Sequence, residues 1–254
     1  MTALAHRLDR TIVIKARPET VFRFFTDEKR WAAWWGQGST IDARPGGRVR
    51  IRHPEGTEVA GEVLEVAPPA RLVFTYGYAS GQPIPAGASR VTITLERHAA
   101  GTRLSLLHEL PDEASRDAHV QGWRFQLSLF ANVVSNEVNA AAGEAVDAWF
   151  RAWALPEAEA REAFARIASP DVRFRDRFSL VDGLADLLPH VMGAQRFMPG
   201  LRLERRGEVR HCQGTVLAEW VAVAADGRER GRGTNVFVFD ASARIESATG
   251  FWAT

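Results

Sequence analysis

Cysteine is almost absent from this chain of 254 residues, in which Cys212 is the only one. A single thiol excludes an internal disulfide, which fits a reducing compartment. No stretch reaches the ~18 consecutive apolar residues that a membrane-spanning helix needs, and the first residues contain no apolar run of signal-peptide length. We therefore expect a cytoplasmic protein that does not associate with a membrane.

An excess of charge of one sign is lacking too, because 32 basic and 31 acidic side chains leave a formal net charge of +1. This balance excludes a global field that would attract nucleic acid or an anionic membrane. In the second half, arginines alternate with acidic residues, a pattern that favours a solvated sheet face over a binding patch. We expect no nucleic-acid partner.

The sequence also lacks the spacings typical of metal and nucleotide sites. Its seven histidines show no H-x-H or H-E-x-x-H pattern, so no metal site is indicated. There is neither a G-x-S-x-G motif nor a phosphate-binding glycine loop, and Gly231-Arg-Gly233 is expected to form a turn. Cys212 lies in a strand pattern without a neighbouring motif, which favours a buried thiol over a nucleophile. We expect no metal and no cofactor.

The chain is long enough for two domains, and its pattern changes in the middle. A hydrophobic content of 46% and a charged content of 25% are ordinary for globular protein. One apolar stripe at helical spacing covers residues 113–134, is lost over residues 136–143, and a new pattern then begins. We expect a domain boundary in that segment, with domains over residues 8–138 and 143–254.

The first half reads as a strand, two short helices, five or six antiparallel strands and one long helix. Residues 11–16 alternate as a half-buried strand does. Pro18 suits the first turn of a helix, and a second helical piece ends at Gly36. The loop 77–89 is rich in Gly and Pro, and it is either a binding loop or an exposed hairpin tip. The stripe of the long helix is Val120, Trp123, Leu127, Phe130 and Val134.

The second half reads as three helices followed by a curved antiparallel sheet. Its helices are expected around residues 146–153, 160–167 and 184–197, with a turn at Ser169-Pro170-Asp171. The strands expected after them are 201–206, 209–212, 215–224, 234–240 and 245–252. The fold class predicted for the whole chain is α+β.

An ordered series of motifs runs through the first half: Ala16-Arg-Pro-Glu-Thr-Val-Phe22, Phe25-Thr26-Asp27, Trp31 with Trp34-Trp35, Gly46-Gly47, Gly61-Glu62-Val63 and Gly122-Trp123. In these motifs, residues 8–138 resemble the SRPBCC superfamily, also called START or Bet v 1-like. Within it they resemble the branch related to activators of the heat-shock-protein-90 ATPase. The resemblance implies a helix-grip fold, in which an antiparallel sheet and a long C-terminal helix enclose a cavity for lipids, polyketides or other apolar molecules.

Shorter motifs mark the second half: Val146–Trp153, Ser169-Pro-Asp-Val-Arg-Phe-Arg-Asp176, Asp182-Gly183, and Phe237-Val-Phe-Asp240 with Arg244-Ile245. In these, residues 143–254 resemble the SnoaL-like group, whose fold is shared with ketosteroid isomerase and nuclear transport factor. The resemblance implies a cone in which a curved sheet wraps three helices around an apolar pocket. Such cones commonly pair through their sheets, so a homodimer through the C-terminal sheet is expected.

Within the first domain, seven side chains are candidates for contact with an apolar ligand. Trp35 is expected at the mouth of the cavity, and Tyr76 and His108 are the polar groups expected to face inward. The other candidates are Phe74, Trp123, Leu127 and Phe130. The alternative is a filled two-layer core without a cavity, in which Tyr76 and His108 are hydrogen-bonded core residues.

In the second domain, the resemblance places Asp176 where ketosteroid isomerase keeps its general base. An apolar pocket disfavours the ionised form of a carboxyl group and so makes it a better base toward carbon. The oxyanion donors of the isomerase are missing, since Trp149 or Phe150 replaces its tyrosine and Asn235 its second aspartate. The alternative is that Asp176 braces a strand end through a neighbouring arginine. Trp149, Trp153, Trp220 and His190 are candidates to line the pocket, or are core and surface residues.

Three functions remain open at this point. The first is binding of an apolar small molecule, such as a lipid, polyketide or steroid-like compound, in one or both cavities. The second is a cofactor-independent isomerase or cyclase that acts through Asp176. The third is a protein-interaction role like that of a chaperone activator, which ranks last.

Overall fold

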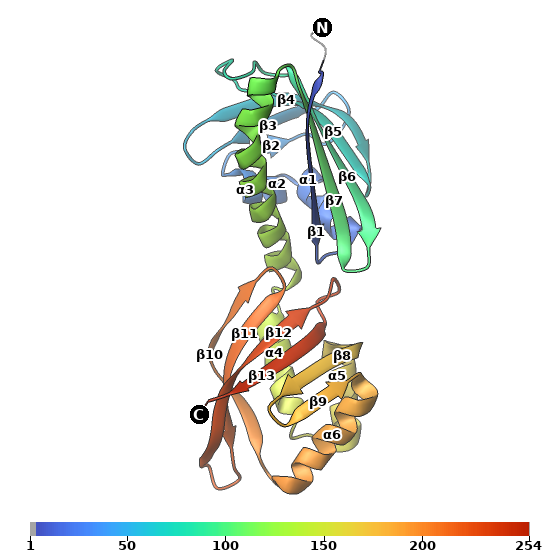
Figure 1. Ribbon diagram of the computed structural model, residues 1–254, viewed down its shortest axis with the longest axis vertical. Coiled ribbons are helices and arrows are strands. Elements are labelled where there is room, and N and C mark those ends of the chain that lie inside the picture. The colour runs from blue at the N-terminus through green and yellow to red at the C-terminus, as the bar shows by residue number, and fades with distance from the viewer. Residues whose placement is uncertain (1–3, 254) are drawn as a thin grey trace. The chain divides into compact units, whose positions relative to one another are not determined.

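The computed structural model describes residues 4–253, which divide into two compact units between Val134 and Ser135. Each unit contains its own sheet and its own helices (Figure 1). The helix α3 (Glu113–Val138) runs through the boundary, so the loss of its apolar stripe at residue 136 does not end it. No helix in the described part of the chain combines the length and apolarity required to span a membrane.

The first unit is a seven-stranded antiparallel sheet in the order β1-β7-β6-β5-β4-β3-β2, with three helices. The strands are β1 (His6–Ile14), β2 (Thr40–Ile41), β3 (Arg48–Arg52), β4 (Glu58–Ala67), β5 (Arg71–Tyr76), β6 (Ser89–His98) and β7 (Gly101–Leu110). The helices besides α3 are α1 (Pro18–Thr26) and α2 (Glu28–Trp35). Figure 1 shows α3 crossing one face of this sheet.

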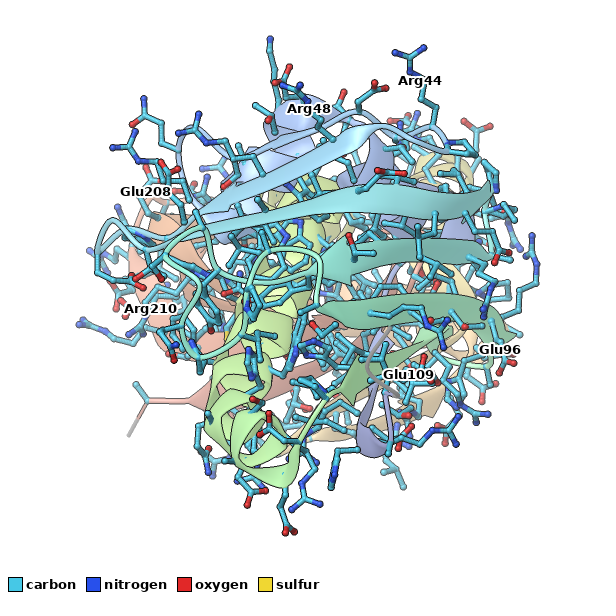
Figure 2. All side chains as sticks on the ribbon, turned by 90° about the horizontal axis from the view of Figure 1, so that it is seen from above. Arg44, Arg48, Glu96, Glu109, Glu208 and Arg210 are labelled. Atoms are coloured by element: carbon cyan, nitrogen blue, oxygen red, sulfur yellow. The ribbon has the colours of Figure 1, made fainter. Side chains whose placement is uncertain are left out.

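Local chemistry explains where these elements begin and end. In β3, arginines alternate with buried Val49 and Ile51, and Arg48 points away from the sheet (Figure 2). The carboxylate of Asp27 caps α2 by accepting a hydrogen bond from the Arg30 amide at 2.9 Å. Gly36 ends that helix at a φ of +130°, where a Cβ atom would lie 2.4 Å from the Arg52 carbonyl oxygen. Only glycine fits this approach of two backbones.

The long helix α3 is anchored at its start and along its apolar stripe. Asp112 caps it by accepting hydrogen bonds from the Ser115 amide at 2.7 Å and the Ser115 hydroxyl at 2.9 Å, and these bonds lower the pKa of Asp112. Further along, Phe130 is fully buried and stacks on Phe25 at a centroid distance of 4.8 Å. This aromatic packing holds the helix against α1 and α2.

The second unit is a six-stranded sheet in the order β10-β11-β12-β13-β8-β9, with three helices. The strands β13 and β8 pair in parallel and the other pairs are antiparallel. The helices are α4 (Ala142–Ala152), α5 (Glu157–Ile167) and α6 (Leu184–Phe197). The strands are β8 (Ala168–Asp176), β9 (Ser179–Asp182), β10 (Arg202–Cys212), β11 (Thr215–Val223), β12 (Glu229–Phe239) and β13 (Ile245–Trp252). The predicted α+β class is confirmed. The prediction of three helices followed by an antiparallel sheet is wrong in two details, since β8 and β9 precede the third helix and β13 pairs with β8 in parallel.

Several local predictions for the second unit are wrong. The expected turn at residues 169–171 belongs to β8, in a stretch where the pairing with β13 is irregular. The glycines at 231 and 233 lie inside β12, where a Cβ atom at Gly233 would lie 2.6 Å from the indole of Trp220. The two strands expected at 201–206 and 209–212 form the single strand β10, which contains a register shift.

The prediction of a buried thiol is also wrong, because Cys212 is exposed. It is the last residue of β10, a strand at the edge of the sheet that has β11 as its one neighbour. The side chains of β10 are exposed or half-buried along its whole length. A strand pattern alone does not distinguish an edge strand from a buried one, so the prediction placed the thiol in the interior.

Candidate functional site

A cleft of about 640 Å³ opens in the first unit, on the side of α3. It is bordered by the end of α2, the connection between β3 and β4, the end of β5 and the first half of α3. Its lining side chains include Trp34, Trp35, Tyr76, Tyr78 and Trp123. The volume lies inside the range of about 300–1,000 Å³ typical of sites for small molecules.

The five aromatic side chains form an unbroken wall. Ring centroids lie 4.2 Å apart for Trp34 and Trp35 and 5.6 Å apart for Trp35 and Trp123. The wall continues from Trp123 to Tyr76 at 6.3 Å and from Tyr76 to Tyr78 at 5.9 Å. These residues come from α2, α3 and β5 with the segment after it, so the wall exists only in the folded unit.

Behind the wall, hydrogen bonds fix the protonation of His108. The indole N–H of Trp123 donates to Nδ1 at 2.9 Å, and an indole nitrogen cannot accept. The proton of neutral His108 is therefore on Nε2, which donates to the Ser89 hydroxyl at 2.8 Å, and that hydroxyl donates to the Tyr76 carbonyl. Burial, together with His119, lowers the pKa of His108 to about 3. Both ring nitrogens are engaged, so His108 positions Trp123 and has no lone pair left for a ligand.

Two further polar side chains meet at the cleft itself. Nδ1 of His119 donates to the Ser115 carbonyl at 2.6 Å, which leaves Nε2 as an acceptor. The phenol of Tyr78 is 3.3 Å from that nitrogen and donates to it. Burial lowers the pKa of His119, and burial also raises the pKa of the neighbouring Tyr76 well above 10, with Tyr78 adding to it. Both shifts favour the uncharged forms of His119 and Tyr76.

The charge in the cleft comes from one carboxylate. Glu55, in the connection between β3 and β4, lines the cleft and is exposed. His53 lines it as well, and burial lowers the pKa of this histidine while Glu55 opposes the shift. Among the described residues, the lining of the cleft contains no arginine and no lysine. The cleft is thus aromatic and uncharged except at Glu55.

Gly122 keeps part of the cleft open. It lies inside α3, lines the cleft, and a Cβ atom built on it meets nothing within 4 Å. Gly in a helix interior is less favourable than Ala by about 1 kcal/mol. Its presence here is costly to the helix and leaves space for a ligand.

The second unit holds a much smaller pocket, of about 70 Å³. A cavity of about 150 Å³ is the size that accepts benzene, so the second pocket is largely filled by its own side chains. Indole groups take up much of the space: Trp149, Trp153, Trp220 and Trp252 all line it. The expected second hollow is therefore only a narrow gap.

Asp176 lines this narrow pocket and does not brace a strand end through an arginine. Its carboxylate accepts hydrogen bonds from the Phe178 amide at 2.8 Å and from the Trp252 indole at 3.2 Å. The neighbouring Arg175 pairs with Asp182 at 2.7 Å.

Asn235 is the second polar residue of this pocket and lies on the other side of Gly250 from Asp176. A Cβ atom on that glycine would lie 3.2 Å from the Asp176 side chain and 3.0 Å from Oδ1 of Asn235. That oxygen accepts a hydrogen bond from the Trp220 indole at 2.8 Å. The amide group of Asn235 is 5% exposed.

Two indole N–H groups of this pocket's lining have no acceptor among the described residues. They belong to Trp149, which is fully buried, and to Trp153, which is half-buried. A buried donor without a partner costs about 1–3 kcal/mol. The second pocket therefore has spare donors where the isomerase resemblance implied that donors were missing.

The structure divides the predicted ligand-contact residues into two groups. Trp35, Tyr76 and Trp123 line the cleft, and Trp149, Trp153 and Trp220 line the narrow pocket. Four others lie elsewhere: Phe74, Leu127 and Phe130 are in the filled core, and His108 is behind the aromatic wall. The eleventh candidate, His190, is half-buried and donates to or accepts from the Ser179 hydroxyl at 2.9 Å.

Sequence reasoning missed Trp34, Tyr78, His119 and Gly122 as lining residues. A signal was present for His119, which lies four residues before Trp123 and hence on the same side of the helix. A signal was present for Tyr78 too, at the start of the loop considered as a binding loop. Trp34 gave none, because a cluster of three tryptophans does not show which of them faces a cavity.

One protein family matches part of the chain. Residues 15–135 match the family model described as Activator of Hsp90 ATPase homolog 1-like protein. The first unit is therefore similar to that family. No curated protein matches the chain.

Solved structures with similarity to the chain each correspond to about half of it. One is a SnoaL-like family protein from Agrobacterium tumefaciens, at 18% identity, 46% of this chain, 99% of that chain and a TM-score of 0.43. A second is the Aha1 dimer from Colwellia psychrerythraea, at 19% identity, with 49% of this chain and 92% of that chain covered and a TM-score of 0.43. A third is a protein from Chromobacterium violaceum, at 28% identity, with 49% of this chain and 94% of that chain covered and a TM-score of 0.41.

Proposed function

We propose that the first unit binds a small molecule with an apolar body in the cleft beside α3. The observation that carries this proposal is a cleft of about 640 Å³ with a continuous wall of five aromatic side chains. Aromatic walls contribute a large contact area at a low cost in side-chain entropy. The hydrogen-bonded His119–Tyr78 pair supplies one small polar region, which orients a ligand without requiring it to be charged.

A neutral fluorophore that brightens in apolar surroundings, N-phenyl-1-naphthylamine, tests the proposal in the full chain. We expect saturable binding by the unmodified protein and a loss of affinity of at least tenfold in Gly122→Leu. Gly122 lines the cleft and nothing lies within 4 Å of its Cβ position, so the new side chain has room to extend over the cleft and obstruct it.

The matched control is Gln121→Leu, which adds the same side chain at an exposed neighbouring position outside the cleft lining. We expect this variant to bind the fluorophore like the unmodified protein. Absence of saturable binding, or equal binding by Gly122→Leu, would overturn the proposal.

A second candidate is acid–base catalysis in the second unit, favoured by the approach of Asp176 and Asn235 across Gly250. In this reaction the carboxylate would take a proton from carbon next to a carbonyl, and spare N–H donors would hold the enolate oxygen. The volume of about 70 Å³ restricts the substrate to a compound smaller than benzene unless the indoles move.

Conversion of 3-butenal, a carbonyl compound smaller than benzene, to its conjugated isomer crotonaldehyde measures this second candidate directly. We expect a rate above the buffer rate that falls at least 100-fold in Asp176→Asn and stays unchanged in the surface variant Asp171→Asn. A rate equal to that of buffer in the unmodified protein would remove the candidate.

A further inference from the structure

The lining of the cleft offers a ligand acceptors and aromatic faces but few donors. The indole N–H of Trp34 donates to the Phe24 carbonyl at 3.2 Å, and that of Trp123 donates to His108 at 2.9 Å. The amide of Gln126 donates to the Trp34 carbonyl, and the phenol of Tyr78 donates to His119. These four donors are engaged within the protein, whereas the buried indole N–H of Trp35 has no acceptor among the described residues and is the one spare indole donor of the wall.

An anionic ligand would therefore find little to bind. A carboxylate or phosphate requires several N–H or O–H donors or a cationic side chain to replace its water. The given lining contains no arginine and no lysine, and the histidines at 53 and 119 have lowered pKa values. The one ionised group, Glu55, repels an anion.

The same features favour a cation. The faces of indole and phenol rings carry negative electrostatic potential and attract a cation within about 6 Å of the ring centroid, most strongly for Trp. Three tryptophans and two tyrosines form the wall, with neighbouring centroids 4.2 to 6.3 Å apart. Glu55 is a carboxylate on the edge of the same cleft, and a carboxylate there compensates the charge of a bound cation.

We propose that the cleft selects organic cations, namely molecules that join a substituted ammonium group to an apolar body. This inference rests on the proposed function of the cleft and adds the charge of its ligand. The ammonium group lies against the tryptophan and tyrosine faces near Glu55, and the apolar body occupies the space beside Gly122.

Three probes that share a benzyl group test the sign of the charge. They are benzyltrimethylammonium, its uncharged carbon isostere neopentylbenzene, and the anion phenylacetate, each measured by displacement of N-phenyl-1-naphthylamine from the full chain. The isostere is the most hydrophobic of the three, so a merely apolar cleft would bind it best. We expect the cation to bind at least tenfold more tightly than the isostere and phenylacetate to bind most weakly.

The variant Glu55→Gln measures the contribution of the carboxylate to cation binding separately from that of the aromatic wall. We expect it to weaken binding of the cation about three- to tenfold, with no change for the isostere, and to reduce the dependence of cation binding on salt. The matched control is Glu96→Gln on β6, an exposed carboxylate at the outer margin of the molecule in Figure 2 and outside the cleft lining. We expect this control to bind all three probes like the unmodified protein.

Failure of this inference and failure of the proposed function would give different results. If the fluorophore binds and Gly122→Leu abolishes its binding, but the isostere or phenylacetate displaces it as well as the cation does, the cleft is a binding site without cation preference and this inference is overturned. If the fluorophore does not bind, or binds equally to Gly122→Leu, the proposed function and this inference are both overturned.

Discussion

The two units share a general plan, a sheet with three helices, and differ in how they use aromatic side chains. In the first unit, Trp34, Trp35 and Trp123 form the wall of a cleft of about 640 Å³. In the second, Trp149 and Trp220 occupy the interior and leave a pocket of about 70 Å³. Richness in tryptophan therefore indicates neither a cavity nor a filled core. The units differ in whether the helix that faces the aromatic rings leaves room beside them, as α3 does at Gly122.

The largest expected difference between the units comes from deleting a core ring. Phe237 is fully buried and contacts both Trp149 and Phe150 at centroid distances of 5.9 Å. We expect Phe237→Ala to destabilise the second unit by about 3–5 kcal/mol, measured by urea unfolding with hydrogen exchange of peptides from each unit. Phe251→Ala, on the neighbouring strand and 58% exposed, should cost below about 1 kcal/mol. Similar costs for both variants would show that the second interior is not packed as described.

Acid should weaken the first unit before the second. The pKa of His108 is about 3 in the folded protein against 6.5 for the free side chain, so the unfolded chain binds its proton first. This contribution to stability is complete above pH 6.5 and is lost as pH falls from 6.5 toward 3. At pH 5 the first unit should lose about 2 kcal/mol.

His53 and His119 add to the loss of stability of the first unit in acid, because burial lowers the pKa of each. Among the described histidines of the second unit, only His211 shows such a lowered pKa. Hydrogen exchange of peptides from both units at pH 7.5 and pH 5, corrected for intrinsic rates, measures the difference. Equal losses in the two units would contradict this prediction.

A half-buried ion pair joins a helix to the edge strand of the second unit. Arg205 of β10 contacts Asp147 of α4 at 2.7 Å, and the hydrogen bond from this guanidinium lowers the pKa of Asp147. We expect Asp147→Asn to destabilise the second unit by about 1 kcal/mol. The exposed pair Glu157–Arg161 within α5 is the control, and Glu157→Gln should change stability by less than about 0.5 kcal/mol. Urea unfolding that ranks the two variants in the opposite order would refute this role of the pair.

The smallest expected effect compares two helix glycines. Gly122 in α3 and Gly193 in α6 both leave the position of a Cβ atom free of contacts within 4 Å. We expect Gly122→Ala and Gly193→Ala each to stabilise its unit by about 0.5–1 kcal/mol, as thermal unfolding would show. Only the first should weaken binding of N-phenyl-1-naphthylamine. Equal effects on binding would break the assignment of the cleft to the first unit.

Prediction from sequence succeeded where the signal was local. The spacing of Trp123, Phe130 and Val134 predicted the long helix, and residues 184–197 form the predicted third helix of the second unit. It failed where residues distant in the sequence decided the outcome. Gly233 is in a strand because β12 pairs with β11 and β13 on its two sides, and Cys212 is exposed because its strand is at an edge.

For the candidate site, the residue types were predictable but their roles were not. Tyr76 and His108 were expected to face inward, and both are buried. Nothing in the order of the residues shows that His108 is held by Trp123 and Ser89, from positions 15 and 19 residues away. The indole N–H of Trp123 is engaged only because such distant partners meet.

The amino-acid sequence by itself determined the helices, most strands and the α+β class, because periodicity and capping act between residues a few positions apart. The tertiary structure alone decided which interior is hollow and what charge it carries. Volume and electrostatics depend on side chains from separate elements, and whether those side chains fill a space or surround it is set only when the elements pack.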